Sequence, residues 1–599
     1  MSIRIADYIA DFIYRQGVKE VFMVTGGGMM FLSDGVCCHP RLKAVFTHHE
    51  QAAAMAAVSY AKYTGNLGAA MVTTGCGGTN TITGVLDAWQ DSVPCIFISG
   101  QSKQKETIRN SRLPLRQFGV QETDIVSIVK PITKYAVMVT DPADISYHLE
   151  KAVHLATTGR PGPVWLDIPL DIQSACIHKD RLTHFNAKDL APGYKVSPSS
   201  AELDAFKAFV SKAARPIVIC GQGVRISKAI QGFTDFVEKY TIPVVASRLG
   251  IDILPAKHPL FIGRIGNKGD RAGNFAVQNA DLVIALGSRL SVSSTGHEYH
   301  TFARQAKLLV VDIDPVEHKK NTVKIDLFIN ADIGTFLKAL PRLRIAPATS
   351  WVNKCQEWKK LWPVFVSGYK NDAKGINLYY FINTLSNALK KGDTVVSDAG
   401  SAFYVTSQAI LLKKGQRYIT SGAQAEMGYT LPAAIGICFA NKKREVIGIT
   451  GDGSFQMNLQ ELQTIVYYNL PVKIFVWNNG GYLSIRATQS KFFHGRSFGT
   501  DQSCGISFPE VKKIAKAYGI NYYRARKSRE LDSVISGVLR ETSPVICEVI
   551  CQKDQEIIPS VATFRRSDGK LASKPLEDMY PFLAREEFVS RMIVQPVKE

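Results

Sequence analysis

The sequence predicts an α/β protein built from three tandem doubly wound parallel-sheet domains. The first observation is length, because 599 residues, 46% of them hydrophobic, are enough for several buried cores. The second is that short apolar runs alternate with amphipathic or alanine-rich stretches, which is the pattern of βαβ units. The third is that this alternation stops and restarts along the chain.

Residues 1–185 are expected to form the first domain. Its predicted strands are 18–25, 44–50, 68–74, 94–100 and 162–169, and 51–63 is a predicted helix. In the opening segment, Ile5, Ile9, Phe12 and Ile13 recur at helical spacing, and acidic residues lie among them. This pattern predicts a helix of the first domain rather than a signal peptide, and therefore a cytoplasmic protein.

The second and third domains are predicted at 195–345 and 370–560. The polar stretch 186–200 contains Pro, Gly and Ser and is expected to be a linker. The predicted strands are 215–223, 242–249, 280–288 and 306–314 in the second domain, and 393–400, 444–454, 471–481 and 543–552 in the third. Residues 561–599 lack periodicity, so we expect a tail that lies on the surface or over a site.

Composition excludes several classes of protein. The net charge of +20 comes from 72 basic and 52 acidic residues that are dispersed along the chain, which favours anionic small molecules and not nucleic acid. No stretch approaches the roughly 18 apolar residues of a membrane span, so no membrane partner is expected. The eleven cysteines include no CxxC pair and are predicted to be reduced, buried thiols rather than zinc ligands.

Two short motifs follow neighbouring strands of the third domain. The strand at 444–454 ends in GDGS, and the strand at 471–481 ends in NNGG. Between them, 457–469 is a predicted helix with Leu459, Leu462, Ile465 and Val466 on one face. A strand, a helix and a strand in this order form a right-handed βαβ unit, whose two strands are parallel neighbours.

This arrangement predicts a ligand site at one edge of the sheet. The carboxyl ends of the two strands share that edge, so Asp452 and Asn479 are expected at one crevice. A carboxylate, a carboxamide oxygen and a nearby backbone carbonyl suit Mg²⁺ or Ca²⁺ that phosphate oxygens also hold. Taken singly, GDG and NNGG are ordinary turn sequences.

Together these motifs resemble those of the thiamine diphosphate enzymes. GDGS, a helix and then NN are similar to the diphosphate and metal motif of that family. Other segments resemble its activating glutamate, aminopyrimidine turn, end of the pyrimidine domain and cofactor loop: THHEQAAAMAAVSYA, TTGCGGTN, GRPGPVWLDIP and SGAQAEMGYTLPAAIG. The resemblance covers nearly the whole chain and is greatest for acetolactate synthase-like members, which have pyrimidine-binding, middle and pyrophosphate-binding domains in that order.

The resemblance implies roles for individual residues. Glu50 would hydrogen-bond the aminopyrimidine ring of thiamine diphosphate, although alone it reads as a helix-start carboxylate favoured by the helix dipole. Gln121 would lie near the reacting carbon. The implied metal ligands are Asp452, Asn479 and the carbonyl of Gly481. The other implied cofactor contacts are Gly27, Asn80, Gly400, Ser401, Ala425, Met427, Gly453, Ser454 and Tyr482.

The resemblance also implies ligands and an assembly. GQGVR at 221–225 and VVDID at 310–314 match positions that hold FAD in relatives, although a glycine pair after a strand is a weak signal. Glu50 and the GDG motif would meet across subunits, so the active site would lie at the interface of a homodimer or homotetramer.

The implied reaction is a carboligation. The enzyme would decarboxylate pyruvate or a similar 2-oxo acid and transfer the two-carbon unit to a carbonyl acceptor. Acetolactate synthases have two aspartates and an arginine where this chain reads GSRLSVSS at 287–294, and a tryptophan near Thr488. The stretch GYLSIRATQ and the tail at 569–588 instead resemble a subgroup found with surface-polysaccharide sugar genes.

This second resemblance makes a nucleotide-linked ketosugar a candidate acceptor, whose diphosphate Arg486 or another excess base would bind. The alternatives are acetolactate synthase itself or a simple 2-oxo acid decarboxylase. An alternative of another class is a non-catalytic nucleotide-binding relative.

Overall fold

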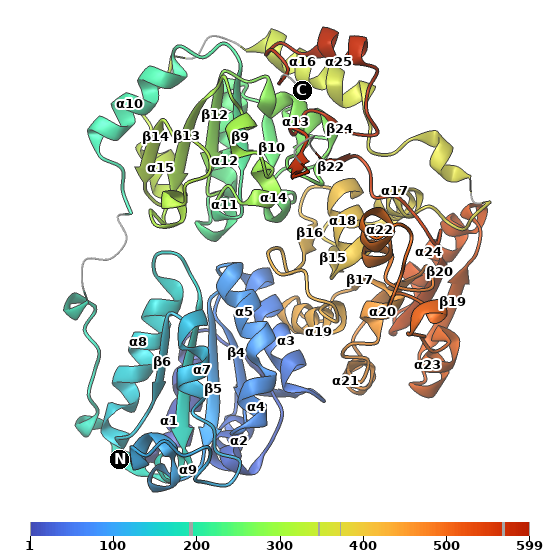
Figure 1. Ribbon diagram of the computed structural model, residues 1–599. Helices are drawn as coiled ribbons and strands as arrows, with labels where there is room; N and C mark the ends of the chain where they lie inside the picture. Colours follow the sequence, from blue (N-terminus) through green and yellow to red (C-terminus); the bar gives the residue numbers. More distant parts are fainter. Residues whose placement is uncertain (1, 191–195, 345–347, 372, 566–568, 598–599) are drawn as a thin grey trace.

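Three six-stranded parallel sheets follow one another along the chain, each flanked by helices (Figure 1). The computed structural model describes residues 2–190, 196–344, 348–371, 373–565 and 569–597. The predicted domain boundaries at 195 and 345 fall outside these residues, as does 191–195 of the expected linker. The predicted architecture of three tandem α/β domains is confirmed.

The first sheet has the strand order β3-β2-β4-β5-β7-β6. Its strands are β2 (Glu20–Met23), β3 (Lys43–Phe46), β4 (Gly68–Val72), β5 (Cys95–Gln101), β6 (Tyr135–Met138) and β7 (Pro163–Pro169). The helices of this part are α1 (Ile5–Arg15), α2 (Met30–Cys38), α3 (Glu50–Thr64), α4 (Cys76–Asn80), α5 (Ile82–Gln90), α6 (Ile108–Ser111), α7 (Ile125–Val129), α8 (Ile145–Thr157) and α9 (Leu170–Ser174). A short antiparallel pair joins β1 (Ser2–Arg4) to β8 (Cys176–His178). The chain order reverses between β2 and β4, which places a crevice at their carboxyl ends.

The second sheet has the order β11-β10-β9-β12-β13-β14. Its strands are β9 (Pro216–Cys220), β10 (Val244–Ala246), β11 (Phe261–Arg264), β12 (Leu282–Leu286), β13 (Lys307–Asp312) and β14 (Leu327–Asn330). Its helices are α10 (Ser200–Val210), α11 (Gly223–Ile226), α12 (Ile230–Tyr240), α13 (Arg271–Gln278), α14 (Val292–Thr295), α15 (Ile333–Ala339) and α16 (Thr349–Leu361). Here the order reverses between β9 and β12.

The third sheet has the order β16-β15-β17-β18-β20-β19. Its strands are β15 (Thr394–Ser397), β16 (Arg417–Ile419), β17 (Val446–Gly451), β18 (Val472–Asn478), β19 (Asn521–Ala525) and β20 (Val545–Ile550). Its helices are α17 (Leu378–Ala388), α18 (Gly400–Ala409), α19 (Thr430–Ala440), α20 (Asp452–Phe455), α21 (Glu461–Tyr467), α22 (Leu483–Phe492), α23 (Val511–Ala517) and α24 (Leu531–Arg540). The reversal lies between β15 and β17, so the GDG motif follows a strand at the switch point.

Helices α3 and α19 join the first and third sheets of the chain (Figure 1). Residues 52–61 of α3 and 430–439 of α19 are all buried, so protein covers both helices on every side along most of their length. Small residues allow a close approach, because a Cβ added to Gly436 would lie 2.1 Å from the carbonyl oxygen of Ala56. The start of α3, where Glu50 lies, is therefore fixed against the third domain.

The predicted helix at 457–469 is too long. The helix α21 begins at Glu461, and Asn458 has a left-handed backbone with φ of +67°. Leu462 and Ile465 are buried as predicted. Asparagine adopts a left-handed backbone more readily than most residues, and the side chain of Asn458 hydrogen-bonds to Gln51 and Gly428 outside the helix.

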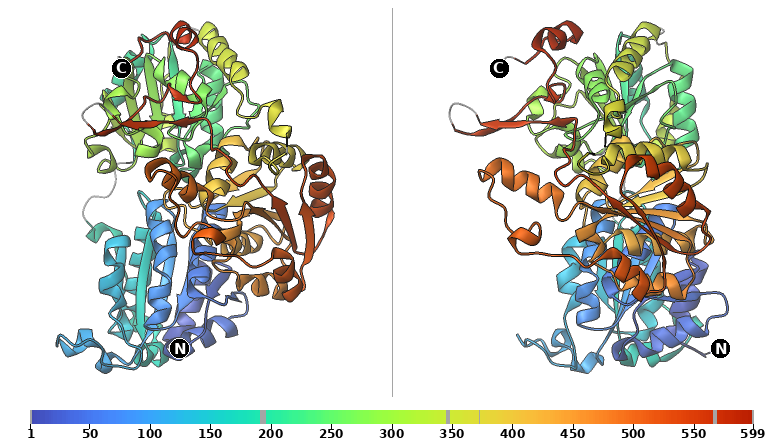
Figure 2. Two further views of the ribbon diagram at one scale, coloured as in Figure 1. Left: turned by 45° about the vertical axis from the view of Figure 1, so that its right-hand side comes forward. Right: turned by 90° about the vertical axis from the view of Figure 1, so that its right-hand side faces the viewer.

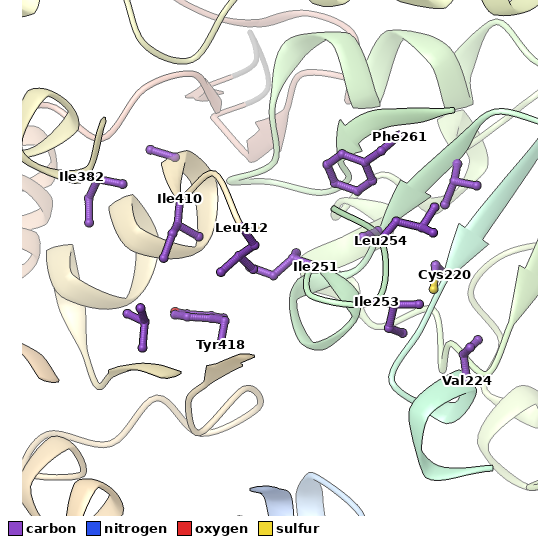
Figure 3. Close-up of a cluster of buried hydrophobic side chains, with 14 of the residues drawn as sticks. Cys220, Val224, Ile251, Ile253, Leu254, Phe261, Ile382, Ile410, Leu412 and Tyr418 are labelled. Carbon is purple, nitrogen blue, oxygen red and sulfur yellow. The ribbon is translucent and has the colours of Figure 1, made fainter. Parts of the chain in front are cut away.

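One apolar core runs through the second and third domains (Figure 3). Ile251, Leu254 and Phe261 of the second domain lie in the same buried cluster as Ile410 and Tyr418 of the third. Such a continuous core holds the two domains together, because separating them would expose apolar surface to water.

A buried ion-pair cluster joins all three domains. Asp252 pairs with Arg225 at 2.7 Å and with Arg417 at 2.8 Å. Arg417 also donates to the carbonyl oxygens of Lys62 and Tyr63 in the first domain, each at 3.0 Å. Burial acts to raise the pKa of Asp252, but the two arginines outweigh it and hold that pKa below its ordinary value.

We expect Asp252→Asn to lower the free energy of unfolding by about 3–5 kcal/mol, because two arginines would remain buried without their carboxylate. Since the folded-state pKa is lowered, the contribution is present above about pH 4 and is lost as the pH falls through that lowered pKa. Urea denaturation at neutral and acid pH measures both effects. Glu510→Gln in the exposed pair with Lys513 is the control and should leave the midpoint unchanged. Equal midpoints for wild type and Asp252→Asn at neutral pH would contradict the prediction.

The tail crosses from the third domain to the second and packs there (Figure 2). It contains β21 (Ser560–Val561), β22 (Thr563–Arg565), β23 (Leu571–Ser573), β24 (Met579–Tyr580) and α25 (Arg585–Arg591). Leu576, Met579 and Phe588 are buried, and Glu577 pairs with Arg304 at 2.7 Å. The tail is therefore an integral part of the second domain's surface and not a loose cover.

Two further expectations can be compared with the structure. All eleven cysteines are free, but Cys37, Cys38, Cys76 and Cys176 are exposed and Cys504 is half-buried, so the prediction of buried thiols holds for only the other six. Among the described residues, no helix has both the length and the apolarity to cross a membrane.

Candidate active site

The ends of β17 and β18 bring Asp452 and Asn479 together. The two strands are parallel neighbours in which Gly451 pairs with Trp477, and Asp452 and Asn479 each directly follow the last residue of their strand. Oδ2 of Asp452 accepts a hydrogen bond of 3.0 Å from the backbone N–H of Gly481, and Oδ1 accepts one of 2.8 Å from Gly453. Both side chains are 4% exposed.

The chemistry of this pair fits a divalent cation. Burial raises the pKa of Asp452 to about 6 against the opposing effect of backbone N–H groups, beginning with that of Gly481. Oδ1 of Asn479 is buried without a hydrogen-bond partner. No group of three or more His, Cys, Asp or Glu in the described chain is placed to hold a metal. A cation here would therefore need further oxygens, from a backbone carbonyl and from phosphate.

Two glycines of the motifs, Gly453 and Gly481, are required by close contacts. A Cβ at Gly453 would lie 2.2 Å from the ring of Tyr482. At Gly481, which has φ of +145°, a Cβ would lie 2.1 Å from the carbonyl oxygen of Thr500. Neighbouring Gly480 also has a positive φ, +69°, but has open space where its Cβ would be. The loop 479–481 is thus held between Asp452 and the segment at 500–501.

Gly481→Ala should weaken the binding of Mg²⁺ with thiamine diphosphate, the ligands that the resemblance implies, by about 10- to 100-fold. The added methyl group must displace either Thr500 or the 479–481 loop. Gly480→Ala is the matched control, because it adds the same group at a positive φ without a clash and should cost only about 1 kcal/mol of strain. Calorimetric titration of both variants measures the difference, and equal affinities would contradict the prediction.

Asp398 connects the ends of β15 and β17 and was not predicted from the sequence. It follows β15, and its Oδ2 accepts hydrogen bonds of 2.7 Å from the hydroxyls of Thr450 and Ser454. Burial raises its pKa. The signal that could have identified it is its position in SDAGS, directly after a strand at the same edge as GDGS.

The only donor hydrogen of the Ser454 hydroxyl is used within the protein. It donates to Asp398 and accepts a hydrogen bond of 2.9 Å from the backbone N–H of Gly428. The groups left to bind phosphate are backbone N–H groups at the start of α20, because the first N–H groups of a helix lack partners within it. Gly400, with φ of +57°, and buried Ser401 begin α18 beside them.

The loop at 420–429 carries the two predicted pyrimidine contacts. Ala425 has a positive φ of +52°, and its N–H donates to the carbonyl of Ser421 at 2.9 Å. Met427 is 36% exposed, which is unusual for a large apolar side chain that only fills a core. Tyr482 is half-buried beside the Asp452 motif, where its ring packs edge-on against Phe508.

The first domain holds a second group of predicted residues at the crevice between β2 and β4. Glu50 begins α3, is 9% exposed and accepts a hydrogen bond of 3.0 Å from Nδ2 of Asn80. Gln121 lies in an exposed loop with φ of +58°, and Gly75 approaches its carbonyl so closely that a Cβ there would lie 2.1 Å away. Gly27 lies in the turn after β2 with open space around its Cα.

The single chain forms two separate groups. Gly27, Glu50, Asn80 and Gln121 belong to the first domain, and Gly400, Ser401, Ala425, Met427, Asp452, Gly453, Ser454, Asn479, Gly481 and Tyr482 belong to the third. In the part of the chain that the structure describes, no hydrogen bond or ion pair joins a member of one group to a member of the other. Their sequence neighbours do meet, since Asn458 donates to Gln51 at 2.9 Å and the N–H of His48 donates to Glu461 at 3.0 Å.

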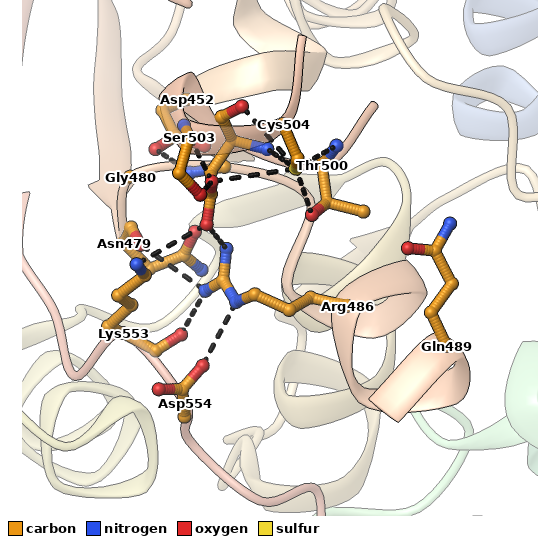
Figure 4. Close-up of polar contacts among 12 residues, drawn as sticks. Asp452, Asn479, Gly480, Arg486, Gln489, Thr500, Ser503, Cys504, Lys553 and Asp554 are labelled. Carbon is orange, nitrogen blue, oxygen red and sulfur yellow. Dashed lines mark hydrogen bonds and ion pairs between the residues drawn. The ribbon is translucent and has the colours of Figure 1, made fainter. Parts of the chain in front are cut away.

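Arg486 is not available to an acceptor, contrary to the sequence-based expectation. It is 8% exposed and pairs with Asp554 at 2.9 Å and with Asp501 at 3.6 Å (Figure 4). It also donates to the carbonyl oxygens of Lys553 and Asn479. Its charge is compensated by carboxylates of the protein, so it is not free to bind a diphosphate. Instead, it stabilises the 479–481 loop through the contact with Asn479.

A cavity of about 450 Å³ lies where the three domains meet. It opens at the switch point of the second sheet, where Gly221 and Gly223 approach Gly287 closely, and Asp312 at the end of β13 lines it. The guanidinium carbon of Arg248 lies 4.0 Å from the ring centre of Phe403, and burial lowers the pKa of Arg248. Burial, together with repulsion from Lys491, lowers the pKa of Lys268 to about 8.

The cations Arg248 and Lys268 favour an anionic ligand in this cavity. Among the described residues, no carboxylate pairs with Arg248 or Lys268. Both side chains therefore lose hydration on burial without gaining an opposite charge, which an anionic ligand such as a diphosphate would supply. A glycine turn, an aspartate at the end of β13 and two cations without a carboxylate partner among the described residues are compatible with the nucleotide part of a cofactor such as FAD.

Comparisons with known proteins give matches along most of the chain. Residues 3–128 match "Thiamine pyrophosphate enzyme, N-terminal TPP binding domain", 203–340 match the central domain and 398–549 match the C-terminal TPP binding domain of that family. The acetolactate synthase large subunit of Cyanidium caldarium is 32% identical over 576 residues, which cover 92% of this chain and 94% of that protein. The same subunit of Lactococcus lactis subsp. lactis is 32% identical over 92% of this chain and 93% of its own length. Chloroplastic acetolactate synthase 1 of Zea mays is 32% identical over 93% of this chain and 86% of its own length.

Proposed function

Because the chain belongs to the thiamine pyrophosphate enzymes, and among them resembles the acetolactate synthases, we propose a specific course for its carboligase reaction. The enzyme decarboxylates pyruvate or a similar 2-oxo acid and transfers the two-carbon unit to a carbonyl acceptor. The observation that carries this proposal is the buried pair of Asp452 and the unpartnered Asn479 at two neighbouring strand ends.

The cofactor is held from two sides in this proposal. Asp452, Asn479 and the carbonyl of Gly481 bind Mg²⁺, and N–H groups at the starts of α18 and α20 bind the diphosphate. Ala425 and Met427 hold the pyrimidine end. When bound, thiamine diphosphate supplies an electron sink for decarboxylation. The chain's own contribution is to orient the 2-oxo acid, to exclude water and, through the Glu50 carboxyl, to hold a proton at the aminopyrimidine.

Glu50 and Asp452 act in the same site only in an assembly of at least two chains. This part of the proposal is supported by the separation of the two groups within one chain. It is also supported by exposed apolar residues near the Glu50 group, namely Met30 (53% exposed), Phe118 (51%) and Val120 (83%), which a partner subunit would cover. We therefore propose a homodimer, or a homotetramer built from such dimers.

FAD is proposed for the cavity between the domains. Arg248 and Lys268 would meet its diphosphate, and Asp312 would meet a ribose hydroxyl. Bound flavin is measured by the visible spectrum of the purified protein near 450 nm. A spectrum without flavin bands, together with failure of added FAD to raise the melting temperature, would contradict this assignment.

Two classes of small molecule are candidates for the acceptor. A nucleotide-linked ketosugar is supported by the open surface at Thr488, which is exposed and carries no bulky side chain to fill the acceptor space. Pyruvate as acceptor is supported by the relatives named acetolactate synthase. Arg486 no longer supports the ketosugar, because it is engaged with Asp554 and Asp501.

Mass analysis of the products from pyruvate decides between these readings. With Mg²⁺ and thiamine diphosphate, we expect carbon dioxide release and a product two carbons larger than a ketosugar nucleotide added as acceptor. Acetolactate as the main product would identify an acetolactate synthase, and acetaldehyde alone a simple decarboxylase. No carbon dioxide from any 2-oxo acid would support the non-catalytic alternative and contradict the proposed function.

A further inference from the structure

The segment that leads to Glu50 runs along the open edge of the first sheet. Strand β3 is an edge strand, so its outer N–H groups have no neighbouring strand to bind. The N–H of Phe46 donates to the hydroxyl of Tyr468 at 2.9 Å, and the N–H of His48 donates to Oε1 of Glu461 at 3.0 Å. The third domain therefore supplies the acceptors that this edge lacks, from both ends of α21.

A second contact holds the chain on the other side of Glu50. Nδ2 of Asn458 donates to Oε1 of Gln51 at 2.9 Å and to the carbonyl oxygen of Gly428 at 3.1 Å. An amide nitrogen has two hydrogens, so this side chain makes both of its donor bonds. The turn formed by residues 458–461, called here the 458–461 turn, thus binds the residues at 48 and 51, which flank Glu50.

The geometry of the 458–461 turn leaves these contacts little freedom. Asn458 is 7% exposed, and a Cβ added to Gly428 would lie 3.1 Å from its Nδ2 and 2.8 Å from the carbonyl of Met457. Glu461 is 0% exposed and also accepts a hydrogen bond of 2.7 Å from the hydroxyl of Thr464. The side chains of Asn458 and Glu461 are each fixed by hydrogen-bond partners on two sides. They therefore hold residues 51 and 48 in place and do not adapt to movements of these residues.

We propose that the 458–461 turn positions Glu50, and that Asn458 and Glu461 are the positioning residues. The inference rests on the proposed function, since it assigns these residues to the placement of the carboxyl that holds the aminopyrimidine proton. A proton-transfer group must lie within about 2.6–3.2 Å of its partner, so small shifts of the α3 start have large effects. Through Gly428, the same side chain of Asn458 links that start to the loop that carries Met427.

The first test needs no cofactor. Amide hydrogen exchange of the apo protein, followed by mass spectrometry of peptides from 43–55, reports on this segment. Glu461→Ala removes the acceptor of His48, and Asn458→Gly removes the donor to Gln51 while glycine keeps the left-handed backbone. We expect exchange at 48–51 to become about tenfold faster or more in both variants. Unchanged exchange in both would overturn the proposal.

Two further variants separate positioning from general support of the interface. Tyr468→Phe is the matched control, because it deletes an acceptor from the same helix but frees the N–H of Phe46, four residues before Glu50. Glu461→Gln is the conservative variant, because its amide oxygen still accepts from His48. Melting temperatures of all four variants show whether each remains folded. If Glu461→Ala or Asn458→Gly unfolds, the comparison uses the other of these two variants.

The second test measures exchange of the thiazolium C2 proton of bound thiamine diphosphate. We expect Glu461→Ala and Asn458→Gly to slow it by about 10- to 100-fold, while Tyr468→Phe and Glu461→Gln stay near wild type. Equal slowing by Tyr468→Phe would overturn the positioning role in favour of simple interface loss. Normal exchange in wild type and in both turn variants would overturn the positioning role alone, whereas no exchange in wild type would contradict the proposed function as well.

Discussion

Glu50→Gln is expected to lower turnover of pyruvate by about 10²–10⁴-fold, the usual value of a proton-transfer group. Glutamine keeps the shape of the side chain, and its amide oxygen still accepts the hydrogen bond from Asn80. What it loses is the ability to hold a proton at the aminopyrimidine. The affinity for thiamine diphosphate and the melting temperature should therefore change little, and exchange of the C2 proton should fall together with turnover.

Glu150→Gln provides the control for this substitution. Glu150 lies on α8 of the same domain and accepts hydrogen bonds from Ser146 and from the N–H of Phe185, away from the crevice between β2 and β4. It should turn over pyruvate at the wild-type rate. If Glu50→Gln kept more than about a tenth of wild-type turnover, the proton-holding role of Glu50 would be wrong.

Asp452→Ala should reduce the affinity for thiamine diphosphate and Mg²⁺ by about 10²-fold or more, because it removes the carboxylate that we propose as a metal ligand. The same change frees the N–H groups of Gly453 and Gly481, so the 479–481 loop loses a contact that fixes it. Titration calorimetry at constant Mg²⁺ measures the loss. For wild type, a chelator that removes Mg²⁺ should release the cofactor.

Asp554→Ala is the matched control for the Asp452 variant. Asp554 belongs to the cluster of Figure 4, but its side chain is 74% exposed, pairs with Arg486 and makes no hydrogen bond to Asp452 or Asn479 among the described residues. Exposed ion pairs contribute little, so its removal should leave cofactor affinity within a few-fold of wild type. Wild-type affinity in Asp452→Ala would show that the cation binds elsewhere.

Co-expression of Glu50→Gln and Asp452→Ala tests the shared active site. If Glu50 serves the cofactor of the partner subunit, half of randomly formed dimers are mixed and each has one intact site, which restores about a quarter of wild-type activity. Each variant alone should be nearly inactive. An inactive mixture of folded, dimeric protein would show that Glu50 and Asp452 act within one chain.

The strands that sequence reasoning found and those it missed differ in their place in the sheets. The unpredicted strands of the three sheets are β6, β11, β14, β16 and β19, and each is an edge strand. Central parallel strands are covered on both faces and read as continuous apolar runs, as β17 and β18 do. Edge strands such as β19, Asn521–Ala525, keep polar and exposed residues and lack that signal.

The site residues also divide into those that the sequence placed correctly and those that only the structure revealed. Asp452 and Asn479 were found because two apolar strands and the segment between them fixed their positions at one sheet edge. Asp398, Asn458 and Glu461 were missed because their partners, Ser454, Gln51 and His48, are either in another strand end or about 400 residues away. Arg486 was expected to bind the diphosphate of an acceptor. The sequence does not show that Asp501 and Asp554 surround it instead.

The sequence by itself determined the three parallel sheets and the placement of Asp452 and Asn479 at one sheet edge, because buried strands and strand-end motifs are local patterns that hydrophobic burial and βαβ handedness convert into one geometry. Only the tertiary structure decided what surrounds that pair: the turn at 458–461 held against the start of α3, and the compensation of Arg486. Contacts between distant segments depend on how whole domains pack, and domain packing leaves no periodic signal in the chain.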